Sequence, residues 1–116
     1  MNGLAMAALV GVGGFGGAIA RYGVGTRLPG PTATLVVNVL GSTAVGVLVA
    51  TDLPDTAVAV AAIGFCGAFT TFSSFAVEVA DRLERGDHAG AVQYATLTLV
   101  TALLGASLGI VAVGWV

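Results

Sequence analysis

Four long runs without a charged side chain dominate this 116-residue sequence. They cover residues 1–20, 28–51, 56–77 and 89–116, and contain 20, 24, 22 and 28 residues. A helix needs about 20 apolar residues to cross a hydrocarbon layer of ~30 Å, so each run is long enough to span a membrane. Only 9% of the residues are charged, which is too few to coat a globule of this size with a solvated surface. The sequence therefore predicts a membrane protein and excludes a soluble enzyme domain.

We expect an all-α membrane protein with a single transmembrane domain over residues 1–116. Its four spans are predicted at about residues 3–24, 32–51, 57–80 and 89–115. Proline stops a helix from inside and suits its first turn, so Pro29 and Pro31 mark the boundary between the first two spans. Small residues four apart within a span, such as Gly13 and Gly17, predict close packing between helices.

The basic residues suggest an orientation for these spans. Arg27, Arg82 and Arg85 lie in or beside the first and third connections, whereas the two termini and the 52–55 loop carry no Arg or Lys. Cytoplasmic loops of membrane proteins are enriched in basic residues. We therefore expect a multi-pass protein of the cell (plasma) membrane, with both termini outside.

The centre of the third span has an unusual composition. Residues 64–75 read GFCGAFTTFSSF, with two Gly, paired Thr, paired Ser and four Phe. Gly and β-branched residues are disfavoured in helix interiors, so the helix is expected to break near its middle. Unwound backbone at membrane depth needs partners from protein, water or an ion, and broken helices coordinate cations in several transporters.

Aromatic side chains in the same segment fall on two faces. Phe72 and Phe75 are three residues apart and share one face of a helix. The edges of their rings carry positive partial charge and are able to face an anion. Alternatively, the two rings belong to the packed core, which is the reading we favour for Phe65 and Phe69 on the adjacent face.

Polar side chains within the spans are expensive in lipid and therefore informative. Asn38 lies near mid-membrane, where its amide either donates to a permeating group or bonds to another helix. Arg21 either snorkels to the interface or raises the anion concentration at a pore mouth. Glu78 is either a vestibule carboxylate or an interface charge.

Hydroxyl groups form a second polar line in the fourth span. Tyr94, Thr98 and Thr101 follow the i, i+4, i+7 spacing of one helix face. They predict a rail of hydrogen-bond donors, although Thr hydroxyls also bond back to their own helix.

Catalytic chemistry has little support. His88 lies in a loop and Cys66 lies deep in a span, and no Ser–His, Cys–His or metal-ligand spacing occurs. We therefore expect no enzyme activity and no catalytic residues. The net charge of −2 and the scattered positions of the four Arg argue against a nucleic-acid partner.

Three motifs together resemble those of the Fluc/CrcB family of fluoride ion channels. They are GGFGGAIARY at residues 13–22, TLVVNVLGS at residues 34–42 and GFCGAFTTFSSF at residues 64–75. The resemblance covers essentially the whole chain, and the third motif is the most specific. Departures are mild: Ala68 replaces a Gly often found there, and Ser74 stands where Thr is frequent.

The resemblance implies a fold, an activity and an assembly. The activity would be passive, fluoride-selective efflux that protects the cell against fluoride toxicity. The assembly would be an antiparallel, dual-topology dimer that encloses two narrow fluoride pathways and binds a structural sodium ion at its centre.

The same resemblance assigns roles to residues at matching positions. Phe72 and Phe75 would line the pathway as an aromatic box, Asn38 would be its polar donor, and Arg21 would lie in the vestibule. Further pathway hydroxyls would come from Thr71, Ser73, Ser74, Tyr94 and Thr98. The sodium ion would bind to the backbone carbonyls of Gly67 and Thr70 from both subunits.

The one-sided arginine count adds a prediction about the partner. Dual-topology homodimers favour balanced loop charge, whereas the bias here favours one fixed orientation. We therefore expect the second subunit to be a paralogue of opposite orientation, giving a heterodimer.

Two other functions remain open. A small multidrug-type cation/proton antiporter needs an embedded carboxylate, and the first span has none; a non-transporting membrane assembly subunit would use its Gly and Phe for packing alone.

Overall fold

All regular elements in the described part of the chain, residues 2–115 of the computed structural model, are helical. Four helical segments are long and apolar enough to cross a membrane: α1 (Gly3–Gly25), α2 (Gly30–Ala50), the third span (Asp55–Glu84) and α6 (His88–Gly114). The third span is composed of α3 (Asp55–Ala57), the π-helix η1 (Val58–Cys66), α4 (Gly67–Phe69) and α5 (Phe72–Glu84). The predicted all-helical, four-span architecture is confirmed.

Local capping interactions set several of the helix boundaries. The Asn2 side chain accepts a 2.9 Å hydrogen bond from the Ala5 N–H and so caps α1. Asp87 caps α6 in the same way, through the Gly90 N–H at 2.9 Å. Pro31 lies in the first turn of α2, where its missing N–H costs no helical hydrogen bond. The third span continues to Glu84, four residues beyond its predicted end at about residue 80.

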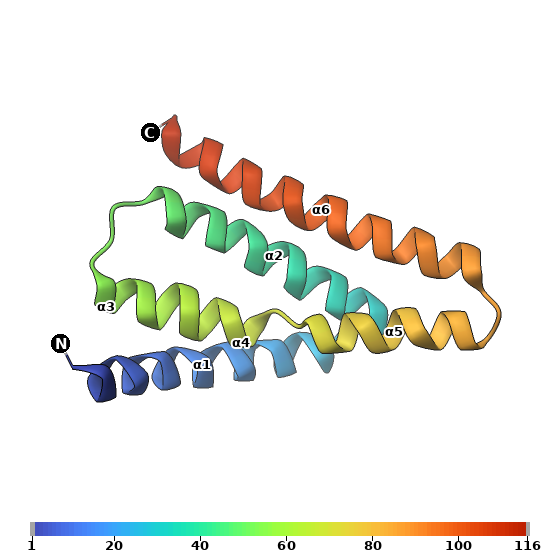
Figure 1. Cartoon of the computed structure of the whole chain (residues 1–116), viewed down its shortest axis with the longest axis horizontal. Coiled ribbons are helices and arrows are strands. Elements are labelled where there is room, and N and C mark those ends of the chain that lie inside the picture. Colours follow the sequence, from blue (N-terminus) through green and yellow to red (C-terminus); the bar gives the residue numbers. More distant parts are fainter. Residues whose placement is uncertain (1, 116) are drawn as a thin grey trace.

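The spans form two adjacent layers, which contact each other through α5 and where α2 packs on η1 (Figure 1). Helix α1 lies along η1 and α4, whereas α2 packs along α6, and α5 contacts both α2 and α6. The two chain ends and the α2–α3 connection lie at one end of the bundle, opposite the α5–α6 turn (Figure 1). Arg82 and Arg85 at the end of α5 are thus separated from the acidic 52–55 loop.

Glycine allows the backbones in both layers to approach closely. A methyl group on Gly17 of α1 would collide with the Phe65 carbonyl of η1. In the other layer, a methyl group on Gly109 of α6 would collide with the Thr43 carbonyl of α2. The small-residue spacing therefore predicts the packing correctly, because each such position faces backbone and not lipid.

The third span breaks at Thr70 and Thr71, between α4 and α5. Both residues have extended backbone angles, with φ −82° and ψ 162° for Thr70 and φ −150° and ψ 115° for Thr71. The predicted break near the middle of the span is confirmed. The nine-residue π-helix before it, Val58–Cys66, is not predicted by the sequence. Such helices are rare and are found mostly as short features at functional sites.

Candidate functional site

The Asn38 side chain binds the backbone at the break. Its Oδ1 accepts the Thr71 N–H at 2.8 Å, and its Nδ2 donates to the Thr71 carbonyl at 3.0 Å. In an unbroken helix that N–H would donate to the Gly67 carbonyl instead. This two-way clamp from α2 replaces the helical partners that the break removes, and it leaves one N–H of the amide group available.

The start of α5 receives two further polar contacts. Thr71 Oγ1 accepts the Ser74 N–H at 3.2 Å and lies 3.3 Å from Ser73 Oγ, so Thr71 is the N-cap of α5. In a continuous helix, the Ser74 N–H would donate to the Thr70 carbonyl. Arg21 Nη1 donates to that carbonyl at 3.3 Å. Arg21 thus reaches from α1 to the break and does more than extend to the membrane interface.

The carbonyls of Gly67 and Thr70 are therefore among those that the break releases from their usual helical partners. No hydrogen bond from a described residue reaches the Gly67 carbonyl, and Gly67 is exposed with open space beside its Cα. Residues 2–115 contain no group of three His, Cys, Asp or Glu side chains suited to a metal. Any cation at this point would depend on backbone oxygen atoms, and the donor set present at Gly67 fits a hard ion.

A cavity of about 400 Å³ lies beside the break. Its lining includes Asn38, Thr71, Phe72, Phe75 and Thr98. The Thr98 side chain is buried, and its hydroxyl has no hydrogen-bond partner among the described residues. The Phe72 and Phe75 rings lie 5.8 Å apart, and Phe72 is 79% exposed. The structure thus gathers five predicted pathway residues around one space that contains no charged side chain.

A second cavity, of about 310 Å³, contains the charged groups. It is lined in part by Arg21, Thr34, Thr71, Ser74 and Glu78. The two residues predicted for a vestibule therefore share one cavity. Thr71 lines both this cavity and the uncharged one, so both spaces border the break.

Tyr94 lies beside the charged cavity. Its hydroxyl donates to the Glu78 carboxylate, which also accepts from Thr34 Oγ1 at 2.9 Å. Ser73 and Ser74 line a neighbouring pocket with Glu78. The hydroxyl line predicted for α6 is therefore divided, because Tyr94 faces Glu78 whereas Thr98 faces the uncharged cavity.

The prediction for Thr101 is wrong. Its hydroxyl donates to the Leu97 and Thr98 carbonyls of its own helix. The side chain lines an apolar groove with residues of α2, away from the cavity at Thr98. Bonding back to the preceding turn, which satisfies a Thr hydroxyl locally, removes Thr101 from any continuous rail.

Sequence reasoning missed two residues of the site, Thr34 and Arg82. Thr34 donates to Glu78, and Arg82 lies over the Tyr94 ring. Both could have been found from helical spacing, since Thr34 is four residues before Asn38 and Arg82 is four residues after Glu78.

Comparison with known proteins places these features in a family. The family described as "CrcB-like protein, Camphor Resistance (CrcB)" matches residues 8–110. A protein of Natronomonas pharaonis named "Fluoride-specific ion channel FluC 2" is 45% identical over 108 residues, covering 92% of this chain and 93% of that protein. "Fluoride-specific ion channel FluC" of Chlorobium chlorochromatii is 40% identical, with 92% and 91% covered. "Fluoride-specific ion channel FluC 3" of Methanosarcina acetivorans is 38% identical, with 90% and 97% covered.

The clamp predicts that Asn38→Asp destabilises the protein. The carboxylate loses the donor to the Thr71 carbonyl and sets an oxygen against it, which leaves a buried acceptor unsatisfied. We expect a loss of about 1–3 kcal/mol in the free energy of unfolding, measured by thermal unfolding of the purified protein in detergent.

Ser42→Ala is the matched control, because Ser42 lies one turn further along α2 and lines the same cavity. It should change the stability by less than about 0.5 kcal/mol. Equal melting temperatures for Asn38→Asp and the wild type would contradict the clamp.

Proposed function

The chain belongs to the CrcB family, and on this premise we propose that it is a fluoride-selective ion channel and not an enzyme. It lets fluoride leave the cytoplasm passively and so protects the cell against fluoride toxicity. The observation that carries this proposal is the cavity at the break, where neutral hydrogen-bond donors and two Phe rings surround a space without a fixed charge. The names of the relatives favour a channel over an antiporter or an assembly subunit.

Neutral donors suit a strongly hydrated anion. Fluoride loses its water only where other donors replace it, and a fixed positive charge would trap it. The Thr98 hydroxyl and the second N–H of Asn38 supply such donors. The N-terminus of α5, which begins at Phe72, adds a positive helix-dipole end. The Phe72 and Phe75 ring edges complete the lining. Chloride, which is larger and accepts hydrogen bonds more weakly, is excluded by a narrow route of this kind.

The charged cavity then serves as the vestibule. Arg21 raises the local concentration of the anion there. The hydroxyls of Thr71 and Ser74 line this cavity with Arg21, and Ser73 lines the neighbouring pocket with Ser74; in this proposal they receive the ion along α5. Tyr94 contributes to this vestibule indirectly, because its hydroxyl donates to Glu78, which lines the cavity.

A second subunit completes the pathway in this proposal. Phe72 is largely exposed at the edge of an open cavity, and Gly67 faces open space. Both are explained if an antiparallel partner covers this face. A sodium ion at the dimer centre would bind the Gly67 and Thr70 carbonyls of both subunits and offset their negative partial charge. Gly67 fits this role well, whereas the Thr70 carbonyl would share its lone pairs with Arg21.

The orientation follows from the basic residues. Arg82 and Arg85 lie at the end of the bundle opposite the two chain ends. Their loop is cytoplasmic in this proposal, with the termini outside the plasma membrane. Because this bias fixes one orientation, the oppositely oriented partner is a paralogue.

Replacing Phe72 tests the channel directly. Liposomes that contain the wild-type protein, with its paralogue when the pair is needed, should release fluoride much faster than chloride, as recorded with ion-selective electrodes. Phe72→Ile removes the aromatic edge but keeps an apolar, though shorter, side chain. We expect fluoride efflux to fall about ten-fold.

Phe65→Ile is the control, because Phe65 stacks on Phe69 away from the cavity. It should leave efflux close to the wild-type rate. Fluoride efflux that is unaffected by Phe72→Ile, or no faster than chloride efflux, would refute the proposed pathway.

Epitope tags at the two termini test the orientation. In intact cells, both tags should be accessible to antibody from outside only, because the charged end of α5 stays in the cytoplasm. A variant without the three loop arginines, Arg27→Gln with Arg82→Gln and Arg85→Gln, should lose this bias. Equal labelling from both faces of the membrane in the wild type would reject the fixed orientation, and with it the need for a paralogous partner.

A further inference from the structure

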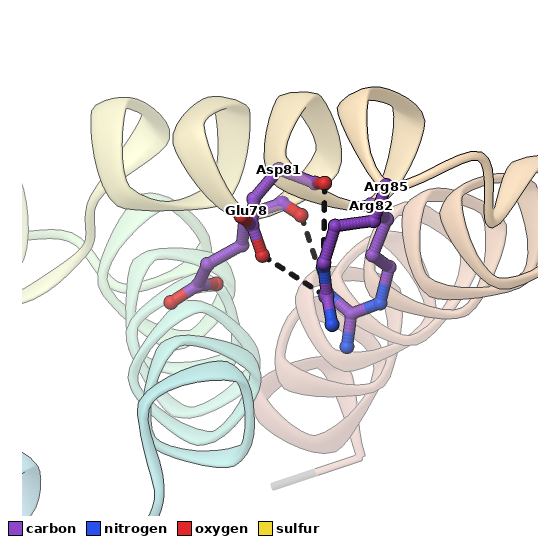
Figure 2. Close-up of polar contacts among 4 residues, drawn as sticks. All are labelled: Glu78, Asp81, Arg82 and Arg85. Carbon is purple, nitrogen blue, oxygen red and sulfur yellow. Dashed lines mark hydrogen bonds and ion pairs between the residues drawn. The ribbon is translucent and has the colours of Figure 1, made fainter.

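Arg82 turns inward from the last turns of α5. Its guanidinium carbon lies 4.5 Å from the centre of the Tyr94 ring on α6, and its Nη1 donates to the Glu78 carbonyl at 3.3 Å (Figure 2). A guanidinium over an aromatic face is an attractive cation–π contact, which is stronger where water is partly excluded. Tyr94 itself is 8% exposed. Arg82 therefore covers one face of a buried ring.

Arg85, three residues further on, has a different environment. It pairs with Asp81 at 2.9 Å, and both side chains are about 60% exposed, at 62% and 60%. It also donates to the Asp81 carbonyl of its own helix at 3.4 Å (Figure 2). The two arginines thus differ in contacts but not in charge, which makes Arg85 a natural control for Arg82.

The carboxylate of Glu78 points away from both arginines, towards α2 (Figure 2). Its partners are the hydroxyls of Thr34 and Tyr94, and no cation of a described residue lies within 4 Å of it. The same side chain lines the cavity that contains Arg21 and Ser74. Thr34 lines this cavity too, so the carboxylate is held at its wall, and a carboxylate free to turn further into the cavity would repel an anion there.

We propose that Arg82 is a positioning residue that holds the Glu78 carboxylate at the α2 wall of the vestibule cavity and keeps it from turning further into the route of the anion. By holding the Tyr94 ring, Arg82 keeps the phenol hydroxyl on Glu78, and this hydroxyl together with that of Thr34 holds the carboxylate against α2. A cation on the ring face also makes the phenol a stronger donor. The inference rests on the proposed fluoride channel and assigns it a new residue.

The proposal explains why the contact needs an arginine. The planar guanidinium stacks on a ring while its N–H groups still donate, here to the Glu78 carbonyl. Tyr94 also lies 5.7 Å from Phe75, centre to centre. Displacement of the Tyr94 ring would therefore disturb both the vestibule and the uncharged cavity.

The test is a set of fluoride efflux rates from liposomes for the wild type, Arg82→Met, Glu78→Gln, the double variant and Arg85→Met. Methionine keeps an apolar contact with the Tyr94 ring but removes the charge. We expect Arg82→Met to slow efflux about five-fold. Glu78→Gln should conduct, and Arg82→Met should have no further effect when glutamine replaces Glu78, because a neutral side chain does not repel fluoride. Arg85→Met should match the wild type.

Three results would overturn the proposal. They are wild-type efflux in Arg82→Met, an equal slowing by Arg82→Met in the Glu78→Gln background, and no conduction by Glu78→Gln. The second result would mean that Arg82 only stabilises the fold. A wild-type protein that passes no fluoride would instead count against the proposed channel function.

Discussion

The hydrogen bonds between Asn38 and the backbone of Thr71 make the rest of this structure possible. A break in a membrane helix leaves N–H and C=O groups without partners, each costing several kcal/mol in lipid. One amide side chain from α2 satisfies both groups of Thr71. Because its N–H is held there, the Gly67 carbonyl is released, α5 begins at Phe72, and the Phe72 and Phe75 rings come to line the adjacent cavity.

Charged and uncharged side chains line different cavities beside the break. The cavity at the break contains no charged side chain, whereas Arg21 and Glu78 share the cavity that adjoins it. Arg82 does not line either cavity and lies over the Tyr94 ring. An anion would therefore meet charge where it is concentrated and neutral donors where it must keep moving. The scarcity of charge in the sequence reflects this division as well as the membrane.

Local sequence predicts local structure well here. Uncharged runs indicate the four spans, paired Thr beside Gly indicates the break, and the spacing of Gly13 and Gly17 indicates close packing, because each depends on residues near in sequence. The resemblance to a family adds the roles of Asn38, Phe72 and Phe75. These roles remain predictions, and the structure brings the three residues to one cavity.

Contacts between helices could not be predicted in the same way. Which group Asn38 binds, 33 residues away, depends on how α2 is rotated against the break, and close glycine contacts set that rotation. Tyr94 and Thr101 follow the same helical spacing, yet their hydroxyls have different partners. The Tyr94 hydroxyl donates to Glu78, whereas the Thr101 hydroxyl donates to a carbonyl of its own helix. The π-helix Val58–Cys66 likewise has no marker in its sequence of ordinary helix and strand formers.

The clamp at the break is the central claim, and the exchange rate of one amide hydrogen tests it most directly. Thr71 has extended backbone angles, and without a partner its N–H would exchange with solvent as fast as those of the 52–55 loop. Hydrogen exchange followed by NMR on the wild-type protein should instead show the Thr71 amide protected to the same degree as the helical amides of α4 and α5. A Thr71 amide that exchanges as fast as the loop amides would contradict the account.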